Sequence, residues 1–185
     1  MKCEKQEEQK RIDSRCNNIL AKIIPENRIV KLTVSAMYVA LTVVLSALSI
    51  PVGVMRCYPV QHFINVLSAI TLGPEYSILI AFVTSLIRNI LGTGTLLAFP
   101  GSMVGALCCG MVFKYTRKYY LTYLAEIIGT GIVGGLIAFP VAAFVMGKKC
   151  AVYAFILPFL VSTIGGTIIA AILIGVLRKI KFTNY

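Results

Sequence analysis

An arginine and an asparagine stand side by side in an apolar stretch, at Arg88 and Asn89, and the sequence Gly-Thr-Gly-Thr follows at 92–95. An arginine side chain keeps its charge in proteins, so in apolar surroundings it must reach water or be met by hydrogen-bond acceptors. The glycines permit unusual backbone dihedral angles, and the threonine hydroxyls can hydrogen-bond a ligand. This stretch indicates the wall and lid of a pocket for a small polar molecule.

A second polar group consists of Gln61, His62 and Asn65. Residues three and four apart lie on one face of a helix, so these side chains can line one wall of a pocket. His62 is the only histidine of the chain, and a single histidine is often just a hydrogen-bonded helix start. The sequence leaves both interpretations open, although the neighbouring amides support ligand binding.

Glu126 is an isolated carboxylate in the apolar run of residues 119–146. It can contact the ligand from below, pair with a buried base, or serve as a structural hydrogen-bonding residue, and the sequence leaves these roles open. The six cysteines form no CxxC pair and no metal-ligand spacing with the histidine. We therefore expect no metal site and no cofactor, and we expect the cysteines to pack as small apolar residues.

The composition places these polar residues in a membrane protein. Hydrophobic residues make up 58% of the chain and charged residues 14%, and the mean hydropathy is +0.85. Soluble domains contain roughly 45–50% apolar and about 25% charged residues. The net charge of +11 lies mostly at the flanks of apolar runs, which is typical of membrane proteins and not of a nucleic-acid binder. We predict an all-α integral membrane protein in contact with the lipid bilayer.

Proline and glycine pairs divide the apolar sequence into helices. The N-terminal segment lacks an early apolar region, so no signal peptide is expected. We predict a cytosolic tail over 1–30, a six-helix membrane domain over 31–180 and a cytosolic C-terminal tail over 181–185. The six expected spans are 31–50, 59–73, 75–91, 101–115, 119–146 and 151–177.

The distribution of lysine and arginine predicts the orientation of the helices. With a cytosolic N-terminus, fourteen of these residues fall on the inner side and three on the outer side. Cytosolic segments carry an excess of Lys and Arg, so both termini should be cytosolic. In this orientation the candidate ligand-binding residues other than Glu126 gather toward the extracellular face; they are Arg56, Gln61, His62, Asn65, Arg88, Asn89, Thr93, Thr95 and Ser102.

The depths of these residues predict their contacts. Arg88, Asn89, His62 and Asn65 should face one another, with the residues 92–95 closing over an occupied site. Ser102 lies near the start of the next helix, where backbone N–H groups can meet a polar ligand. The alternative is that Arg88 snorkels to the outer headgroups, as long basic side chains do near helix ends.

The first helix carries small residues one turn apart, Ala36 and Ala40. Small residues with this spacing allow two membrane helices to approach closely, although packing within the bundle would use the same pattern.

Together these residues resemble a known family. A six-helix chain with Ala-x-x-x-Ala in its first helix looks like the substrate-binding S component of an energy-coupling factor (ECF) vitamin transporter. Within that group, PVQH, SLIRNILGTGTLLAFPGS and EIIGTG closely resemble the ThiW family, over about residues 31–180.

The resemblance implies a non-enzymatic membrane receptor for a thiamin precursor, thought to be hydroxyethylthiazole, in a bacterial-type cell membrane. It also implies a transmembrane coupling subunit, docked on Ala36 and Ala40, and two cytosolic ATPases. The chain has no Walker A motif of its own. It also lacks tryptophan, so an aromatic residue that stacks on the ligand would be Tyr58, Phe63, Phe99 or Phe139.

Other functions remain in view. A self-sufficient secondary transporter would need coupling residues, yet the sequence shows no inverted repeat and nearly no intramembrane carboxylates. A membrane enzyme would have only one histidine and one buried glutamate for catalysis. An S component for another thiamin-related ligand would share every feature described above.

Overall fold

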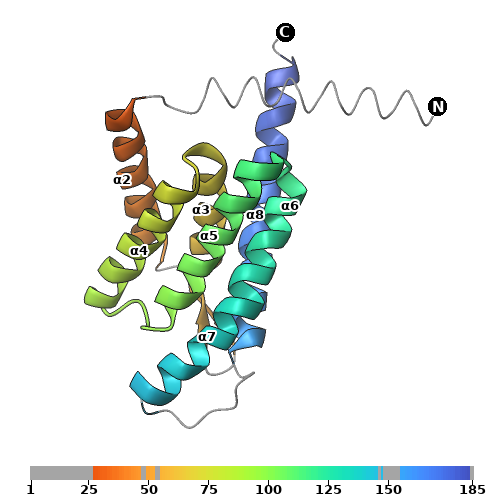
Figure 1. The fold of residues 1–185 in the computed structure, drawn as a ribbon. Coiled ribbons are helices and arrows are strands. Elements are labelled where there is room, and N and C mark those ends of the chain that lie inside the picture. Colours follow the sequence, from red (N-terminus) through yellow and green to blue (C-terminus); the bar gives the residue numbers. More distant parts are fainter. Residues whose placement is uncertain (1–26, 47–48, 53–54, 146, 148–154, 184–185) are drawn as a thin grey trace, which may run out of the picture.

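The structure is a computed structural model that describes residues 27–46, 49–52, 55–145, 147 and 155–183. Most of the predicted N-terminal tail therefore lies outside the described residues, as do Lys148, Lys149 and the last two positions of the predicted C-terminal tail. The described chain is a helical bundle with one short hairpin (Figure 1).

The helices form in the order expected from the sequence. A long helical rod occupies the place of the predicted fifth span, and it alternates between α-helical and π-helical segments. Its segments are α6 (Tyr119–Glu126), η1 (Ile127–Gly134), α7 (Gly135–Pro140) and η2 (Val141–Val145). The other helices are α2 (Arg28–Leu45), α3 (Pro59–Thr71), α4 (Pro74–Ile90), α5 (Ala98–Thr116) and α8 (Ile156–Thr183).

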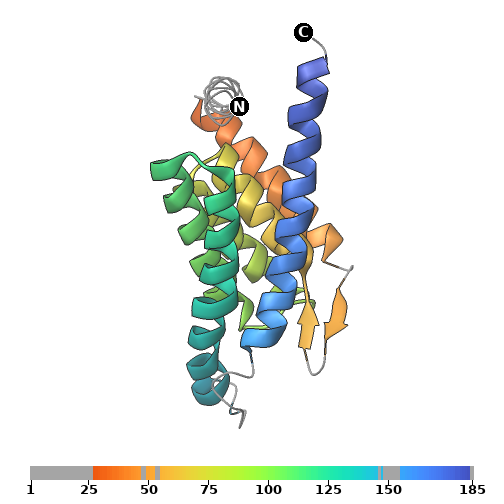
Figure 2. The ribbon, with the colours of Figure 1, turned by 90° about the vertical axis from the view of Figure 1, so that its right-hand side faces the viewer.

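Among the described residues, three helices are long and apolar enough to cross a membrane: Arg28–Leu45, Tyr119–Val145 and Ile156–Leu177. The helices α3 and α4 are shorter, with 13 and 17 residues. A spanning helix needs roughly 20 residues unless neighbours bury its ends, and the views in Figures 1 and 2 place α3–α5 alongside the longer helices.

The first predicted span, 31–50, is wrong at its end, because α2 stops at Leu45. A strand β1 (Ile50–Val52) follows and pairs in antiparallel register with β2 (Met55–Cys57), with Ile50 opposite Cys57. The residue before a proline is driven toward extended backbone, so Pro51 favours a strand at Ile50 although the run is apolar.

The predicted proline and glycine breaks are confirmed where they bound α3 and α4. Pro59 and Pro74 each occupy the first turn of a helix, where a missing N–H costs little. Gly73 and Gly92 have positive φ angles of 87° and 70°, a backbone conformation that residues other than glycine rarely adopt. The break at Gly92 is therefore a helix C-terminal cap.

The bundle has two distinct ends. The hairpin and the 91–97 loop lie at one, called here the hairpin end, together with the start of α8. The thiol of Cys57 donates a hydrogen bond of 3.2 Å to the carbonyl of Pro158, which fastens the hairpin to α8 (Figure 2). Burial raises the pKa of that thiol, so it stays protonated and can donate.

Candidate functional site

A cavity opens at the hairpin end, between the starts of α3, α5 and α8 and the middle of η1. The space inside it that water-sized molecules can occupy is small, about 40 Å³. Its lining combines one exposed arginine with hydroxyl, amide, imidazole and aromatic groups. The lining residues are Arg56, Tyr58, Gln61, His62, Thr95, Ala98, Gly101, Ser102, Thr130, Pro158, Phe159 and Ser162.

The first turn of α3 supplies the central polar groups of this cavity, Gln61 and His62, and both are buried. Close packing by α8 holds the turn in place. A Cβ added at Gly166 would lie 2.7 Å from Cβ of His62 and would overlap the carbonyl oxygen of Pro59. The glycine therefore lets α8 press on the backbone that carries the imidazole.

A buried carboxylate lies behind the cavity. Glu126, at the end of α6, is 0% exposed. Its Oε1 lies 2.9 Å from Nδ1 of His62 and accepts hydrogen bonds from Nδ2 of Asn65 and Oγ1 of Thr130, both at 3.1 Å. Its Oε2 accepts from Sγ of Cys109 at 3.0 Å. An ionised carboxylate only accepts hydrogen bonds, and every one of these neighbours can donate.

Glycine makes room for this cluster on α5. A Cβ added at Gly105 would overlap Oγ1 of Thr130 and lie 2.7 Å from Oε2 of Glu126. Thr130 reaches the carboxylate from the π-helical segment η1, one turn beyond Glu126. π-helical turns occur often at functional sites. The cluster therefore depends on a missing side chain on α5 and a widened turn in the neighbouring rod.

Arg88, near the end of α4, is also 0% exposed. Its guanidinium carbon lies 3.8 Å from the centre of the Tyr58 ring, and its Nη1 donates a hydrogen bond to Oε1 of Gln61. A cation stacked on an aromatic ring is attracted by the ring's electron density. The Nε and Nη2 atoms of Arg88 have no hydrogen-bond partner among the described residues, and this side chain lines a smaller space beside Thr42 and Ser46.

Side-chain hydrogen bonds join these two buried charges across the bundle. Nε2 of Gln61 donates to Oγ of Ser85 at 3.1 Å, and the hydroxyls of Ser85 and Ser102 are 3.1 Å apart. Nδ2 of Asn65 donates both to the carbonyl of Ser102, at 3.2 Å, and to Glu126. Buried networks of this kind are rigid when every member is satisfied.

The 91–97 loop closes the hairpin end above Arg88. The hydroxyl of Tyr58 donates to the carbonyl of Thr93 at 2.7 Å. Nδ2 of Asn89 donates to the carbonyls of Ser85 and Thr95, at 2.8 and 3.1 Å. Asn89 therefore shapes the loop, and Tyr58 links that loop to the start of α3.

The structure brings most of the residues selected from the sequence to one end of the bundle. Five of them line the cavity: Arg56, Gln61, His62, Thr95 and Ser102. Three others, Asn65, Arg88 and Glu126, lie behind these in the hydrogen-bond network, and Asn89 and Thr93 belong to the loop region.

The predicted pairing of Arg88 with His62 and Asn65 is wrong. Arg88 contacts Gln61 and Tyr58, whereas His62 and Asn65 contact Glu126. Snorkelling of Arg88 is also wrong, because its side chain is fully buried. Two of the three roles left open for Glu126 are seen here: it pairs with the base His62, and it accepts structural hydrogen bonds from Asn65, Thr130 and Cys109.

Several lining residues were not predicted, among them Thr130, Phe159 and Ser162. A serine and a threonine within apolar helices are a weak signal, since such residues also bond to their own helix. Of the aromatic residues suggested for stacking, Tyr58 lines the cavity. Phe63 and Phe139 pack in apolar clusters, and the Phe99 ring lies 5.7 Å from that of Phe82.

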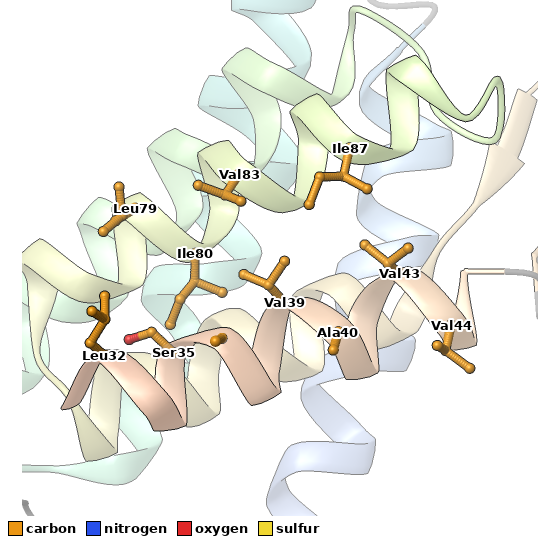
Figure 3. A pocket seen from close by; sticks show the side chains of 11 residues that line it. Leu32, Ser35, Val39, Ala40, Val43, Val44, Leu79, Ile80, Val83 and Ile87 are labelled. Carbon is orange, nitrogen blue, oxygen red and sulfur yellow. The ribbon is translucent and has the colours of Figure 1, made fainter. Parts of the chain in front are cut away.

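A second region with predicted residues is the groove between α2 and α4 (Figure 3). Water-sized molecules can occupy about 510 Å³ of it, and it is open to the surroundings. In Figure 3, Val39 and Val43 of α2 lie across it from Val83 and Ile87 of α4. Ala36 and Ala40 line the groove and are exposed.

Comparison with protein families gives a match over most of the chain. Residues 32–180 match the family described as thiamine-precursor transporter protein (ThiW). The match covers most of the chain, and it includes the cavity, the buried network and the groove. No match was found among curated proteins or among solved structures.

Proposed function

The chain belongs to the ThiW family of thiamine-precursor transporter proteins, and we propose that it is the substrate-binding S component of an ECF-type importer. The family and the apolar helices make it a membrane transport protein for a small molecule. The finer assignment rests mainly on one observation, the cavity at the hairpin end with a buried hydrogen-bond network behind it. Such a cavity suits binding and release, and no ATP-binding sequence accompanies it.

The proposed ligand is hydroxyethylthiazole. It is a small, uncharged heterocycle with one hydroxyl, and the cavity offers an aromatic ring at Tyr58 and polar groups at Gln61, His62 and Ser102. Five residues selected from the sequence are proposed to contact it, with Thr130, Phe159 and Ser162 added as lining residues; the five are Arg56, Gln61, His62, Thr95 and Ser102. Asn65, Glu126 and Arg88 support this lining from behind.

The proposed membrane arrangement has six spans and both termini in the cytosol. The end of the bundle away from the hairpin carries exposed basic residues at Arg28, Lys114, Arg117 and Lys118. Cytosolic surfaces of membrane proteins are enriched in such residues. This orientation points the cavity outward, where an importer must collect its ligand.

The proposed partner site is the groove between α2 and α4. A transmembrane coupling subunit would cover the exposed small residues Ala36 and Ala40. Two cytosolic ATPases would drive transport by hydrolysing ATP while bound to that subunit. Small residues let helices pack closely in lipid, which supports a helix of the coupling subunit as the occupant.

Calorimetric titration of the purified full-length chain tests the ligand. We expect hydroxyethylthiazole to bind at micromolar or lower concentration, and more tightly than thiamin or its pyrimidine moiety. Absence of thiazole binding would refute the proposed ligand. Tighter binding of thiamin would instead identify an S component for a related ligand.

Uptake measurements test the transport mechanism. Cells that carry this chain alone should not accumulate labelled ligand, whereas cells that also carry the coupling subunit and the ATPases should. Concentrative uptake by the chain alone would favour the alternative, a self-sufficient secondary transporter.

A further inference from the structure

We propose that Glu126 fixes His62 in a single tautomer, and that the free ring nitrogen of His62 selects a ligand by its uncharged hydroxyl group. The inference rests on the proposed function, because it assigns a role within the same cavity. It adds a chemical rule for the ligand: an alcohol should be preferred over both the analogue without the hydroxyl and the phosphate ester.

The first step concerns the protons around Glu126. Oε1 is approached by the amide nitrogen of Asn65 and the hydroxyl of Thr130, and Oε2 by the thiol of Cys109. A carboxylate surrounded by donors is satisfied as an acceptor-only anion. Nδ1 of His62 lies 2.9 Å from the same carboxylate, so it must carry a proton to avoid facing a lone pair with a lone pair.

The second step concerns the other ring nitrogen of His62. A neutral imidazole protonated on Nδ1 leaves Nε2 as an acceptor, and the partner of one nitrogen sets the state of the other. Among the described residues, Nε2 of His62 has no hydrogen-bond partner, and His62 lines the cavity. The imidazole edge opposite Glu126 is therefore available to a ligand.

The third step concerns the rigidity of the ring. The packing of Gly166 on the first turn of α3 prevents His62 from retreating toward α8. Glu126 holds the ring from the other side and is itself held by three further hydrogen bonds. A fixed acceptor discriminates strongly between ligands, because a ligand without a donor leaves it unpaired.

Charge completes the selection. A phosphate ester would bring negative charge toward the Glu126 carboxylate and would offer no neutral hydroxyl to Nε2. Arg88 does not line this cavity, since it lies behind Tyr58 and Gln61. Arg56 does line the cavity wall, but it is exposed, so water and salt screen its attraction for a phosphate. The cavity therefore fits a neutral alcohol better than its phosphate ester.

The test is a calorimetric titration of the purified full-length chain with three ligands. These are hydroxyethylthiazole, the analogue with an ethyl in place of the hydroxyethyl group, and the phosphate ester of hydroxyethylthiazole. A ligand that leaves the buried acceptor without a donor loses affinity, so we expect the alcohol to bind roughly tenfold or more tightly than either other ligand.

Two variants assign this preference to its residues. In His62→Phe the alcohol and the ethyl analogue should bind within about twofold of each other, because the acceptor is gone. Glu126→Gln should reduce the ratio between the affinities for the alcohol and for the ethyl analogue, while the ethyl analogue still binds. If Glu126 were only structural, the substitution would lower both affinities by the same factor. Gly175→Ala is the control, since nothing lies within 4 Å of the added Cβ, and it should keep the wild-type preference.

The outcomes separate this inference from the proposed function. Equal binding of the alcohol and the ethyl analogue by the wild-type chain would overturn the inference and leave the thiazole ligand in place. Binding of the phosphate ester at least as tight as that of the alcohol would overturn it as well. If none of the three ligands binds, the proposed ligand and the inference both fail. The comparison of the three ligands on the wild-type chain needs no variant, so it tests the inference even if His62→Phe does not fold.

Discussion

The interior at the hairpin end and the face between α2 and α4 are built in opposite ways. In the interior, Arg88 and Glu126 are fully buried, and side chains from other helices hydrogen-bond both of them, although two nitrogens of Arg88 have no partner among the described residues. By contrast, the only buried residues of α2 are Ser35, which lines the groove, and Thr42, and each bonds a carbonyl of its own helix, at 2.8 and 2.7 Å. The remaining surface of α2 is mostly apolar and open.

The contrast separates two tasks. A polar ligand is recognised by fixed donors and acceptors, and these need tight support from neighbouring helices. A partner helix in lipid is bound through small residues and close packing, and the surface that receives it stays open until the partner arrives. The same chain therefore has a rigid polar interior for the proposed ligand and an unfilled apolar face for the proposed coupling subunit.

The largest effect is expected on the open face. Ala36→Trp or Ala40→Trp should abolish uptake and co-purification with the coupling subunit, because a large ring fills the groove. Ligand binding by the chain alone should be unchanged, as neither residue lines the cavity. The measurements are uptake of labelled ligand, affinity pull-down and calorimetry.

Met37→Trp is the matched control for that prediction. Met37 is on the same helix and is 65% exposed, but it does not line the groove. It should leave assembly intact. If the complex survives both alanine replacements, the docking surface lies elsewhere, and the groove between α2 and α4 is not the face that binds the coupling subunit.

The next effect concerns the interior packing. Gly105→Ala should lower the free energy of unfolding by about 1–3 kcal/mol, the usual cost of overpacking, because the new Cβ overlaps Thr130 and crowds Glu126. Ligand affinity should fall with it. Thermal unfolding in detergent and calorimetry measure both, and Gly175→Ala, which has open space around it, should change neither. Equal stability of the two variants would show that the carboxylate cluster is loosely packed.

The sequence predicts which residues matter better than it predicts how they pair. Polar residues are conspicuous in an apolar chain, so Gln61, His62 and Arg88 stand out without any structure. Their partners depend on which helices are neighbours. Successive residues on a helix point about 100° apart, so Gln61 turns to α4 while His62 turns to α6.

Two features, the strand β1 and the role of Thr130, could not be predicted because the local sequence around each one indicates something else. The strand β1 (Ile50–Val52) could not be predicted, because its sequence continues the apolar run of the first helix without a visible change in pattern. The role of Thr130 was hidden because Gly129 and Gly131 flank it, and glycine in a membrane helix indicates close packing first. In the structure these glycines do allow close packing, against α5 and α8, and Thr130 bonds Glu126 because the two residues lie one turn apart on the same rod.

A smaller and more specific effect is expected at Arg88. Arg88→Ala should weaken ligand binding roughly tenfold to a hundredfold, or about 1–3 kcal/mol, because Gln61 loses its donor and Tyr58 loses its stacked cation. Calorimetry measures the affinity. Arg28→Ala, an exposed arginine at the far end of the bundle, should have no effect on it. An unchanged affinity in Arg88→Ala would separate this arginine from the ligand site.

The smallest effect is expected at the boundary between the interior and solvent, in Tyr58→Phe. The ring of Tyr58 would still stack on Arg88, so the interior should keep its shape, and only the hydrogen bond to the Thr93 carbonyl would be lost. That carbonyl belongs to an exposed residue, so water can replace the lost donor. A net hydrogen bond of this kind is worth about 0.5–1.5 kcal/mol, or roughly two- to tenfold in a rate.

The change should appear in kinetics more than in equilibrium affinity. If the 91–97 loop opens to release the ligand, breaking the Tyr58–Thr93 link is part of opening, and its removal speeds both release and capture. Stopped-flow measurement of ligand release from the purified chain should then show a faster dissociation rate with a nearly unchanged Kd. An unchanged rate would mean that the ligand leaves by another route. A large rise in Kd would mean instead that the hydroxyl of Tyr58 contacts the ligand, and Tyr58 would then belong to the rigid interior.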